Sequence, residues 1–298
     1  MTGIFDQVKE KKESAFLAGI KQRAAALNKH IVLPEGEDVR VVRAAAEAAK
    51  QKIAGITLLG KKDEIKRDNP GVDLSAVEIV DPATSEKRTA YAQLLFSLRK
   101  AKGMTEEEAD RLSYDNTYFG VLMVKAGDAD GLVSGACHST ANTLRPGLQI
   151  VTAAPGIPVA SSCFSMVAPE GGNPYCEDGV FVYSDCGLNE NPNSEQLADI
   201  AIISARTAEK IAGLQPRVAM LSFSTKGSAK HEDVSKVAAA VALAKEKAPE
   251  LVLDGELQLD AALVPAVAKS KAPGSQVAGH ANVLIFPDLH AGNIGYKL

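Results

Sequence analysis

Two short segments combine serine, threonine and glycine with a basic residue, a combination that binds phosphate groups. The first is Ser134–Pro146, which contains Arg145, and the second is Ser224–Ser228, which contains Lys226. Backbone N–H groups, hydroxyls and a helix N-terminus bind phosphate oxygens, and the cation supplies charge. Neither segment matches a Walker motif or a dinucleotide-binding glycine motif. Both predict an anion site, and the simpler alternative for each is a helix cap that follows a strand.

The role of Arg145 depends on where the helix inside the first segment begins. If it begins near Ser139, Arg145 lies about two turns further on, on the side of Thr140–Asn142, at ~3.6 residues per turn. From there it reaches a bound anion only if that side faces a cleft. The alternative is a surface arginine that is paired with a carboxylate.

Adjacent Cys137 and His138 resemble a nucleophile and a base, but such pairs normally come from separate segments. We therefore expect Cys137 to be structural and His138 to be a polar contact in the site. The four cysteines, at positions 137, 163, 176 and 186, form no C-x-x-C pair. Free thiols are expected in a chain of this length.

Two acidic segments have simpler explanations than catalysis. Glu35, Glu37 and Asp38 are typical of a helix N-terminus, where carboxylates oppose the helix dipole. Asp254-Gly255-Glu256 and Asp260 resemble ligands of a divalent cation, but no second acidic cluster accompanies them, so a capped, solvated turn is the preferred interpretation. The histidines at positions 30, 231, 280 and 290 show no metal-ligand spacing. No metal site is predicted.

Short apolar runs that alternate with amphipathic stretches must position these residues. The strand candidates are Ile31–Leu33, Ile56–Leu59, Val77–Val80, Gly131–Ser134, Val180–Ser184, Val218–Ser224, Leu251–Leu253 and Asn282–Phe286. The helix candidates are Val39–Lys50, Glu195–Ala212 behind Asn193 or Ser194, Asp233–Lys247 and a short helix that Thr105 and Glu108 open with a capping box. The pattern predicts an α/β fold with doubly wound, mostly parallel sheets, whose ligands bind beyond the carboxyl ends of the strands.

The length of 298 residues suits two domains, and we place the boundary at a predicted hinge, 153–158. The predicted domains are 1–154 and 155–298, and 167–179 is the least regular stretch. A net charge of −4 gives no general attraction to nucleic acid or to acidic membranes. No signal peptide and no apolar run of membrane-spanning length is present, so a cytoplasmic location is expected.

Four sequence segments, in the same order along the chain, resemble the phosphate acetyltransferase and phosphate butyryltransferase family, and they resemble its acetyl branch more closely. They are Val133–Val151, Leu221–Ala229, Asp254–Ala262, and Ala281–Leu289 with Gly292–Ile294. The resemblance implies two α/β domains that face a cleft, related to isocitrate and isopropylmalate dehydrogenases, in a homodimer. It implies reversible conversion of acetyl-CoA and phosphate to acetyl phosphate and CoA by direct attack in a ternary complex. Coenzyme A is then a substrate, and no cofactor or metal is bound.

The family's two upstream site arginines correspond to Arg145 and to Arg99 within Leu98-Arg99-Lys100. We expect both guanidinium groups to converge on one small inorganic anion in a groove between the domains and to offset charge on the tetrahedral oxyanion. The residues expected to bind substrate are Ser134, Gly135, His138, Ser139, Thr140, Thr225, Lys226, Gly227, Ser228 and Asn293.

Family members continue beyond the position of Leu298 through a segment that reads Asn-Asp-Leu-Ser-Arg-Gly. In the family, this segment supplies a serine and an arginine at the reaction centre. An aspartate that is proposed as the base for the CoA thiol accompanies them. The end of the chain packs on the first domain. We therefore expect severely reduced turnover from the 298 residues alone. The alternatives are a phosphate butyryltransferase, a non-catalytic protein that binds acyl-CoA or phosphate, and a metal- and nicotinamide-dependent dehydrogenase, for which the required convergent aspartates are not found.

Overall fold

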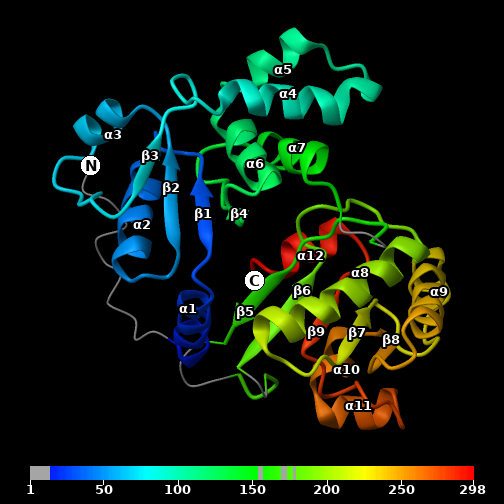
Figure 1. Cartoon of the computed structure of the whole chain (residues 1–298). Helices are drawn as coiled ribbons and strands as arrows, with labels where there is room; N and C mark the ends of the chain where they lie inside the picture. The colour runs from blue at the N-terminus through cyan, green and yellow to red at the C-terminus, as the bar shows by residue number, and fades with distance from the viewer. Residues whose placement is uncertain (1–13, 154–156, 169–172, 177–178) are drawn as a thin grey trace. The chain divides into compact units, whose positions relative to one another are not determined.

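The computed structural model describes residues 14–153, 157–168, 173–176 and 179–298 (Figure 1). They fall into two compact units: residues 21–152 form one, and residues up to 20 together with those from 153 onward form the other. The boundary on the N-terminal side lies within helix α1 (Ala15–Leu27). The predicted hinge includes 154–156, which lie outside the described residues, and the predicted domain boundary stays a prediction.

The unit of residues 21–152 contains a parallel sheet with the strand order β3-β2-β1-β4. The strands are β1 (His30–Leu33), β2 (Gly55–Leu59), β3 (Glu78–Val80) and β4 (Gly131–Leu132). The helices are α2 (Val39–Lys50), α3 (Lys62–Asp68), α4 (Arg88–Arg99), α5 (Glu106–Leu112), α6 (Asn116–Ala126) and α7 (Thr140–Ile150), with a 3₁₀ turn at Lys100–Lys102.

Helices cover both faces of this sheet. Leu58 of β2 packs with Val42 of α2 and Ile65 of α3 in one apolar cluster. Val32 of β1 belongs to a second cluster with residues of α4, α6 and α7, including Phe119. Burial on both faces explains why these strands are short runs of apolar residues.

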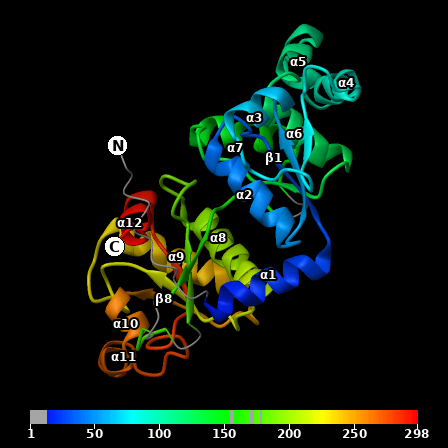
Figure 2. The same ribbon diagram turned by 90° about the vertical axis from the view of Figure 1, so that its left-hand side faces the viewer.

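The other unit contains a five-stranded sheet with the order β5-β6-β9-β7-β8, in which only β5 is antiparallel to its neighbour. The strands are β5 (Phe164–Val167), β6 (Val180–Ser184), β7 (Val218–Leu221), β8 (Leu253–Leu257) and β9 (Val283–Ile285). The helices are α8 (Ser194–Thr207), continued by a π-helical turn at Ala208–Ala212, α9 (Glu232–Lys247), α10 (Leu259–Leu263), α11 (Pro265–Lys271) and α12 (Leu289–Gly295). Figure 2 shows α10 beside α11 in this unit.

The predicted α/β class with mostly parallel sheets is confirmed. Helix α2 has the predicted bounds, Asn193 caps α8 with a complete capping box, and Thr105 caps α5. One strand prediction is wrong, because β8 begins where the predicted strand Leu251–Leu253 ends, and β5 was not predicted. Within the described residues, no helix has the length and apolar character needed to cross a membrane.

Candidate functional site

Arg99 and Arg145 lie on helices that pack together within the unit of residues 21–152. Arg99 is the last residue of α4, and Arg145 lies in the middle of α7. Helix α6 contacts both of these helices, and the rings of Tyr91 on α4 and Phe119 on α6 meet edge to face with centroids 4.9 Å apart. Both arginines therefore come from one unit and one helical layer.

Tyr118, near the start of α6, lies close to both arginines. Its hydroxyl donates a hydrogen bond to Oε1 of Gln149 on α7, at 2.9 Å. Burial raises the pKa of Tyr118, while the positive charges of Arg145 and Arg99 act to lower it. The carboxylates of Asp115 and Glu108 act on the same phenol in the opposite direction, and the convergence of the two guanidinium groups on one anion stays a prediction.

The guanidinium groups of Arg99 and Arg145 have no hydrogen bond or ion pair within the part of the chain that the structure describes. Other arginines of the same unit are paired, as Arg40 is with Asp38 and Arg88 with Asp110. The alternative of a salt-bridged surface arginine therefore does not describe Arg145. Two cations that are not paired with a carboxylate are available to attract an anion.

The first serine- and glycine-rich segment is held by a buried carboxylate. Glu35, which is 1% exposed, follows β1, and its two oxygens accept hydrogen bonds from the four consecutive backbone N–H groups of 135–138, at 2.9–3.1 Å. Burial acts to raise the pKa of Glu35, but these four hydrogen bonds outweigh it and lower the pKa to about 2. These N–H groups are occupied by the protein's own carboxylate, so a phosphate would have to bind to side chains here. The helix-N-terminus explanation holds for Asp38, which caps α2, and is wrong for Glu35.

Glu35 thereby fixes the loop that leads into α7. Gly135 adopts a φ of +115°, which glycine tolerates and other residues avoid. Four residues later, Oγ of Ser139 accepts a hydrogen bond from the Asn142 N–H and caps α7, as predicted, with Thr140 as the first helical residue. The hydrogen bonds of Glu35 to the loop and the cap provided by Ser139 therefore set the start of the helix that carries Arg145.

Two hydroxyl oxygens beside this loop are buried without a hydrogen-bond partner within the described residues, those of Ser134 and Thr143. Both residues line a cavity of about 590 Å³ whose other walls are largely apolar side chains of β4, α6 and α7. Ser134, a predicted substrate-binding residue, thus has a free hydroxyl beside an apolar cavity.

The second segment, Ser224–Ser228, is also held by a buried carboxylate. Oε1 of Glu256, which is 5% exposed, accepts hydrogen bonds from the Ser224 hydroxyl at 2.9 Å and the Gly227 N–H at 2.6 Å. The Thr225 N–H bonds to the Ser228 hydroxyl, and the Lys226 N–H bonds to the Glu256 carbonyl. As in the first segment, these backbone N–H groups already donate hydrogen bonds within the protein.

The side chain of Lys226 is 39% exposed, but its ammonium group is paired within the protein. Its Nζ contacts Asp254 Oδ1 at 2.5 Å and the Gly255 carbonyl at 2.9 Å. Although burial opposes it, hydrogen bonds from Lys226 and Ser275 contribute to lowering the pKa of Asp254 to about 2. The predicted solvated turn at Asp254 and Glu256 is wrong, because both carboxylates lie buried in β8 and are satisfied by these partners.

Asn293 lies on α12, in the unit that also contains Ser224–Ser228. It lines a cavity of about 530 Å³ together with Glu190 and His290. Its side-chain amide donates to the Cys186 carbonyl at 3.3 Å and accepts a hydrogen bond from Lys297. Its assignment as a substrate-binding residue stays a prediction.

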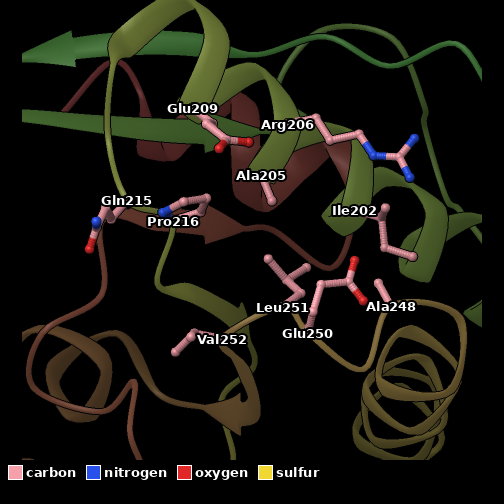
Figure 3. Close-up of a pocket in the computed structure, with 10 residues that line it drawn as sticks. All are labelled: Ile202, Ala205, Arg206, Glu209, Gln215, Pro216, Ala248, Glu250, Leu251 and Val252. Carbon is pink, nitrogen blue, oxygen red and sulfur yellow. The ribbon is translucent and has the colours of Figure 1, made fainter.

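A further cavity of about 320 Å³ lies away from the predicted site, at the amino-terminal ends of β7 and β8. Figure 3 shows Arg206 and Glu209 near the end of α8, Gln215 and Pro216 before β7, and the segment Glu250–Val252 before β8 around it. Ligands of open α/β sheets bind at the opposite, carboxyl ends of the strands. This position does not support a role in the predicted chemistry.

The roles that the sequence analysis missed are mainly those of buried carboxylates in or just after strands. Glu35 and Glu256 have the roles given above. Asp185, after β6, accepts hydrogen bonds from the N–H groups of 187–189 and from Ser162. The only available signal was an acidic residue within an otherwise apolar strand-and-turn segment. Tyr118 and Gln149 were missed because their spacing matches no motif.

Comparisons with known proteins agree on one family. The profile of the family described as phosphate acetyl/butaryl transferase matches residues 15–298. The chain is 55% identical to a phosphate acetyltransferase of Thermoanaerobacterium thermosaccharolyticum over 95% of this chain and 86% of that protein. It is 47% identical to a phosphate acetyltransferase of Bacillus subtilis over 94% of this chain and 84% of that protein. A crystal structure of a phosphotransacetylase from Streptococcus pyogenes superposes with a TM-score of 0.88 at 42% identity, covering 96% of this chain and 85% of that one.

Proposed function

The chain belongs to the phosphate acetyl/butyryl transferase family, and we propose that it catalyses reversible acetyl transfer between coenzyme A and inorganic phosphate, with Arg99 and Arg145 binding the phosphate. The observation that carries the proposal is the pair of unpartnered guanidinium groups around Tyr118. Two fixed cations suit a doubly charged phosphate, and guanidinium groups bind phosphate oxygens in a bidentate fashion.

In the proposed reaction, a phosphate oxygen attacks the thioester carbonyl carbon in a ternary complex. A C–O bond forms, the carbonyl oxygen carries negative charge in the tetrahedral intermediate, and the C–S bond then breaks. The thiolate of coenzyme A takes up a proton, and acetyl phosphate is released. The arginines position the phosphate and stabilise the negative charge, which removes much of the entropic and electrostatic barrier.

The other proposed substrate contacts are residues at the carboxyl ends of strands or at the helices that follow. They are Ser134, Gly135, His138, Ser139, Thr140, Thr225, Lys226, Gly227, Ser228 and Asn293. We further propose that the protein acts as a homodimer in the cytoplasm. Light scattering in solution tests the homodimer.

The test of the activity is a phosphate-dependent release of free CoA from acetyl-CoA, with acetyl phosphate identified as the co-product. A dependence on both substrates, with no acetyl transfer when either is omitted, is expected from a ternary complex. Binding of CoA without turnover would instead favour the non-catalytic acyl-CoA-binding protein. Comparison of acetyl-CoA with butyryl-CoA decides between the two branches of the family.

Replacing Cys137 by serine should leave kcat/KM within about threefold of the wild-type value, because direct attack needs no acyl-enzyme. Burial and the carboxylates of Glu37 and Glu35 raise the pKa of the Cys137 thiol to about 11, so it is protonated at neutral pH and a poor nucleophile. Steady-state rates of wild type and Cys137→Ser test this. A loss of activity together with an acetylated cysteine in the wild-type mass spectrum would contradict it.

A further inference from the structure

The loops that follow β7 and β8 lead the chain to opposite faces of the five-stranded sheet. These two strands are parallel neighbours. Met220 of β7 packs in one apolar cluster with α9, which follows β7, whereas Leu221 packs in another cluster with α10 and α11, which follow β8. Successive strand residues point to opposite faces, so α9 lies on one face and the other two helices on the other. Ligands of open α/β sheets bind at strand ends where the chain departs in this way.

Hydrogen bonds join the two loops at these strand ends. The Thr225 hydroxyl oxygen accepts a hydrogen bond from the Gln258 N–H at 2.9 Å and donates one to the Gln258 side-chain oxygen at 3.3 Å. The loops therefore lie side by side. Ser224–Ser228, the segment that we propose to contact substrate, is part of one of them.

Each side of this junction exposes a large apolar side chain. Phe223, directly before the serine-rich segment, is 57% exposed, and Leu259, the first residue of α10, is 48% exposed. The Phe223 ring meets the ring of His231, the N-cap residue of α9, at 67° with centroids 5.9 Å apart. A single exposed apolar residue is common. An aromatic ring that is held by a neighbour, yet open to solvent where ligands bind, indicates a contact surface for a flat apolar group.

The charge of the loop after β7 favours a negatively charged ligand. Residues 222–231 contain two lysines and no acidic residue. The ammonium group of Lys226 is paired, whereas the side chain of Lys230 has no hydrogen bond or ion pair among the described residues. The acidic residues that follow, Glu232 and Asp233, lie in the first turn of α9, where they complement the helix dipole. A ligand with both a flat ring and phosphate groups is a nucleotide, and coenzyme A carries a phosphorylated adenosine.

We propose that the adenine ring of coenzyme A stacks on Phe223, with Leu259 at the border of the same surface and Lys230 near the phosphates. The inference rests on the proposed acetyl transfer and adds a nucleotide subsite to it. Phe223, Leu259 and Lys230 are not among the substrate contacts named above. Loss of one base–aromatic stack weakens binding by about 5- to 150-fold.

Steady-state kinetics with two acetyl donors test the inference. Phe223→Ala should raise the KM for acetyl-CoA at least about fivefold with little change in kcat. With S-acetylpantetheine, which lacks the nucleotide, Phe223→Ala and wild type should react equally. Phe223→Tyr keeps the ring and should resemble wild type. The matched control is Tyr175→Ala, which removes another exposed aromatic side chain of the same unit and should leave the KM unchanged.

A binding measurement that needs no turnover is possible because the chain contains no tryptophan. Phe223→Trp introduces a single fluorescent ring that can still stack. Its fluorescence should be quenched by coenzyme A and by ADP, which carries the same base, and not by pantetheine. Tyr175→Trp is the control and should not respond to any of the three.

The stacking inference and the proposed activity fail separately. Quenching of Phe223→Trp by coenzyme A in a protein without acetyl transfer would support the nucleotide subsite and refute the activity. Normal acetyl transfer with an unchanged KM in Phe223→Ala, or without quenching in Phe223→Trp, would overturn the subsite alone. Dissociation of an oligomer by Phe223→Ala, seen in light scattering, would place the ring in a subunit contact and would also overturn it.

Discussion

Replacing Arg145 by alanine is expected to lower kcat/KM for phosphate by about 10²–10³-fold, the range found when one preorganised stabilising group is removed. Arg145 has no protein partner among the described residues, so its loss leaves no buried carboxylate uncompensated and should hardly change stability. Arg145→Lys keeps the charge but loses the planar fork, and an intermediate loss is expected. Steady-state kinetics with phosphate varied at saturating acetyl-CoA measure the effect.

The matched control is Arg43→Ala, which removes an exposed arginine of α2 in the same unit. It should leave kcat/KM unchanged, whereas Arg99→Ala should resemble Arg145→Ala. If the two arginines bind one phosphate, the double variant should lose less than the product of the two single losses, because each single variant already disrupts the shared contact. Equal activity of Arg43→Ala and Arg145→Ala would contradict the assignment of the phosphate site.

The helix that carries Arg145 could be predicted because its signals are local. Ser139 is a strong N-cap residue, and the following residues continue in helical spacing. Helix α2 was predicted to the residue for the same reason, since Asp38 precedes an amphipathic run. The packing of α4 against α6, which brings Arg99 near Tyr118, depends on contacts such as Tyr91 with Phe119 that no spacing rule encodes.

The buried carboxylates could not be predicted, because their partners are distant in the sequence. Glu35 bonds to residues about a hundred positions later, and without them an acidic residue before a helix indicates a cap. Asp254 and Glu256 were interpreted as a solvated turn because no second acidic cluster accompanied them, and acidic residues are seldom buried unless paired. Lys226 and Ser224 provide that pairing, and they lie in the loop that follows another strand, β7.

Replacing Glu35 by glutamine is expected to lower the free energy of unfolding by about 2–4 kcal/mol, because an amide NH₂ would face backbone donors that the second carboxylate oxygen now satisfies. The loop before Ser139 would lose its anchor, so kcat should also fall. Urea unfolding at pH 7 measures the first effect. The control Glu37→Gln changes an exposed carboxylate two residues away and should shift the midpoint little.

The pH dependence of the unfolding free energy distinguishes the role of the ionised Glu35 carboxylate from a general loss of packing. The pKa of Glu35 is lowered from 4.5 to about 2 in the folded protein, so the unfolded chain takes up the proton first as the pH falls. The stability that Glu35 contributes is therefore fully present above pH 4.5 and is lost as the pH falls toward about 2. The difference in unfolding free energy between wild type and Glu35→Gln should shrink over this interval. A difference that stays constant from pH 7 to pH 3 would show that the ionised carboxylate is not what holds the loop.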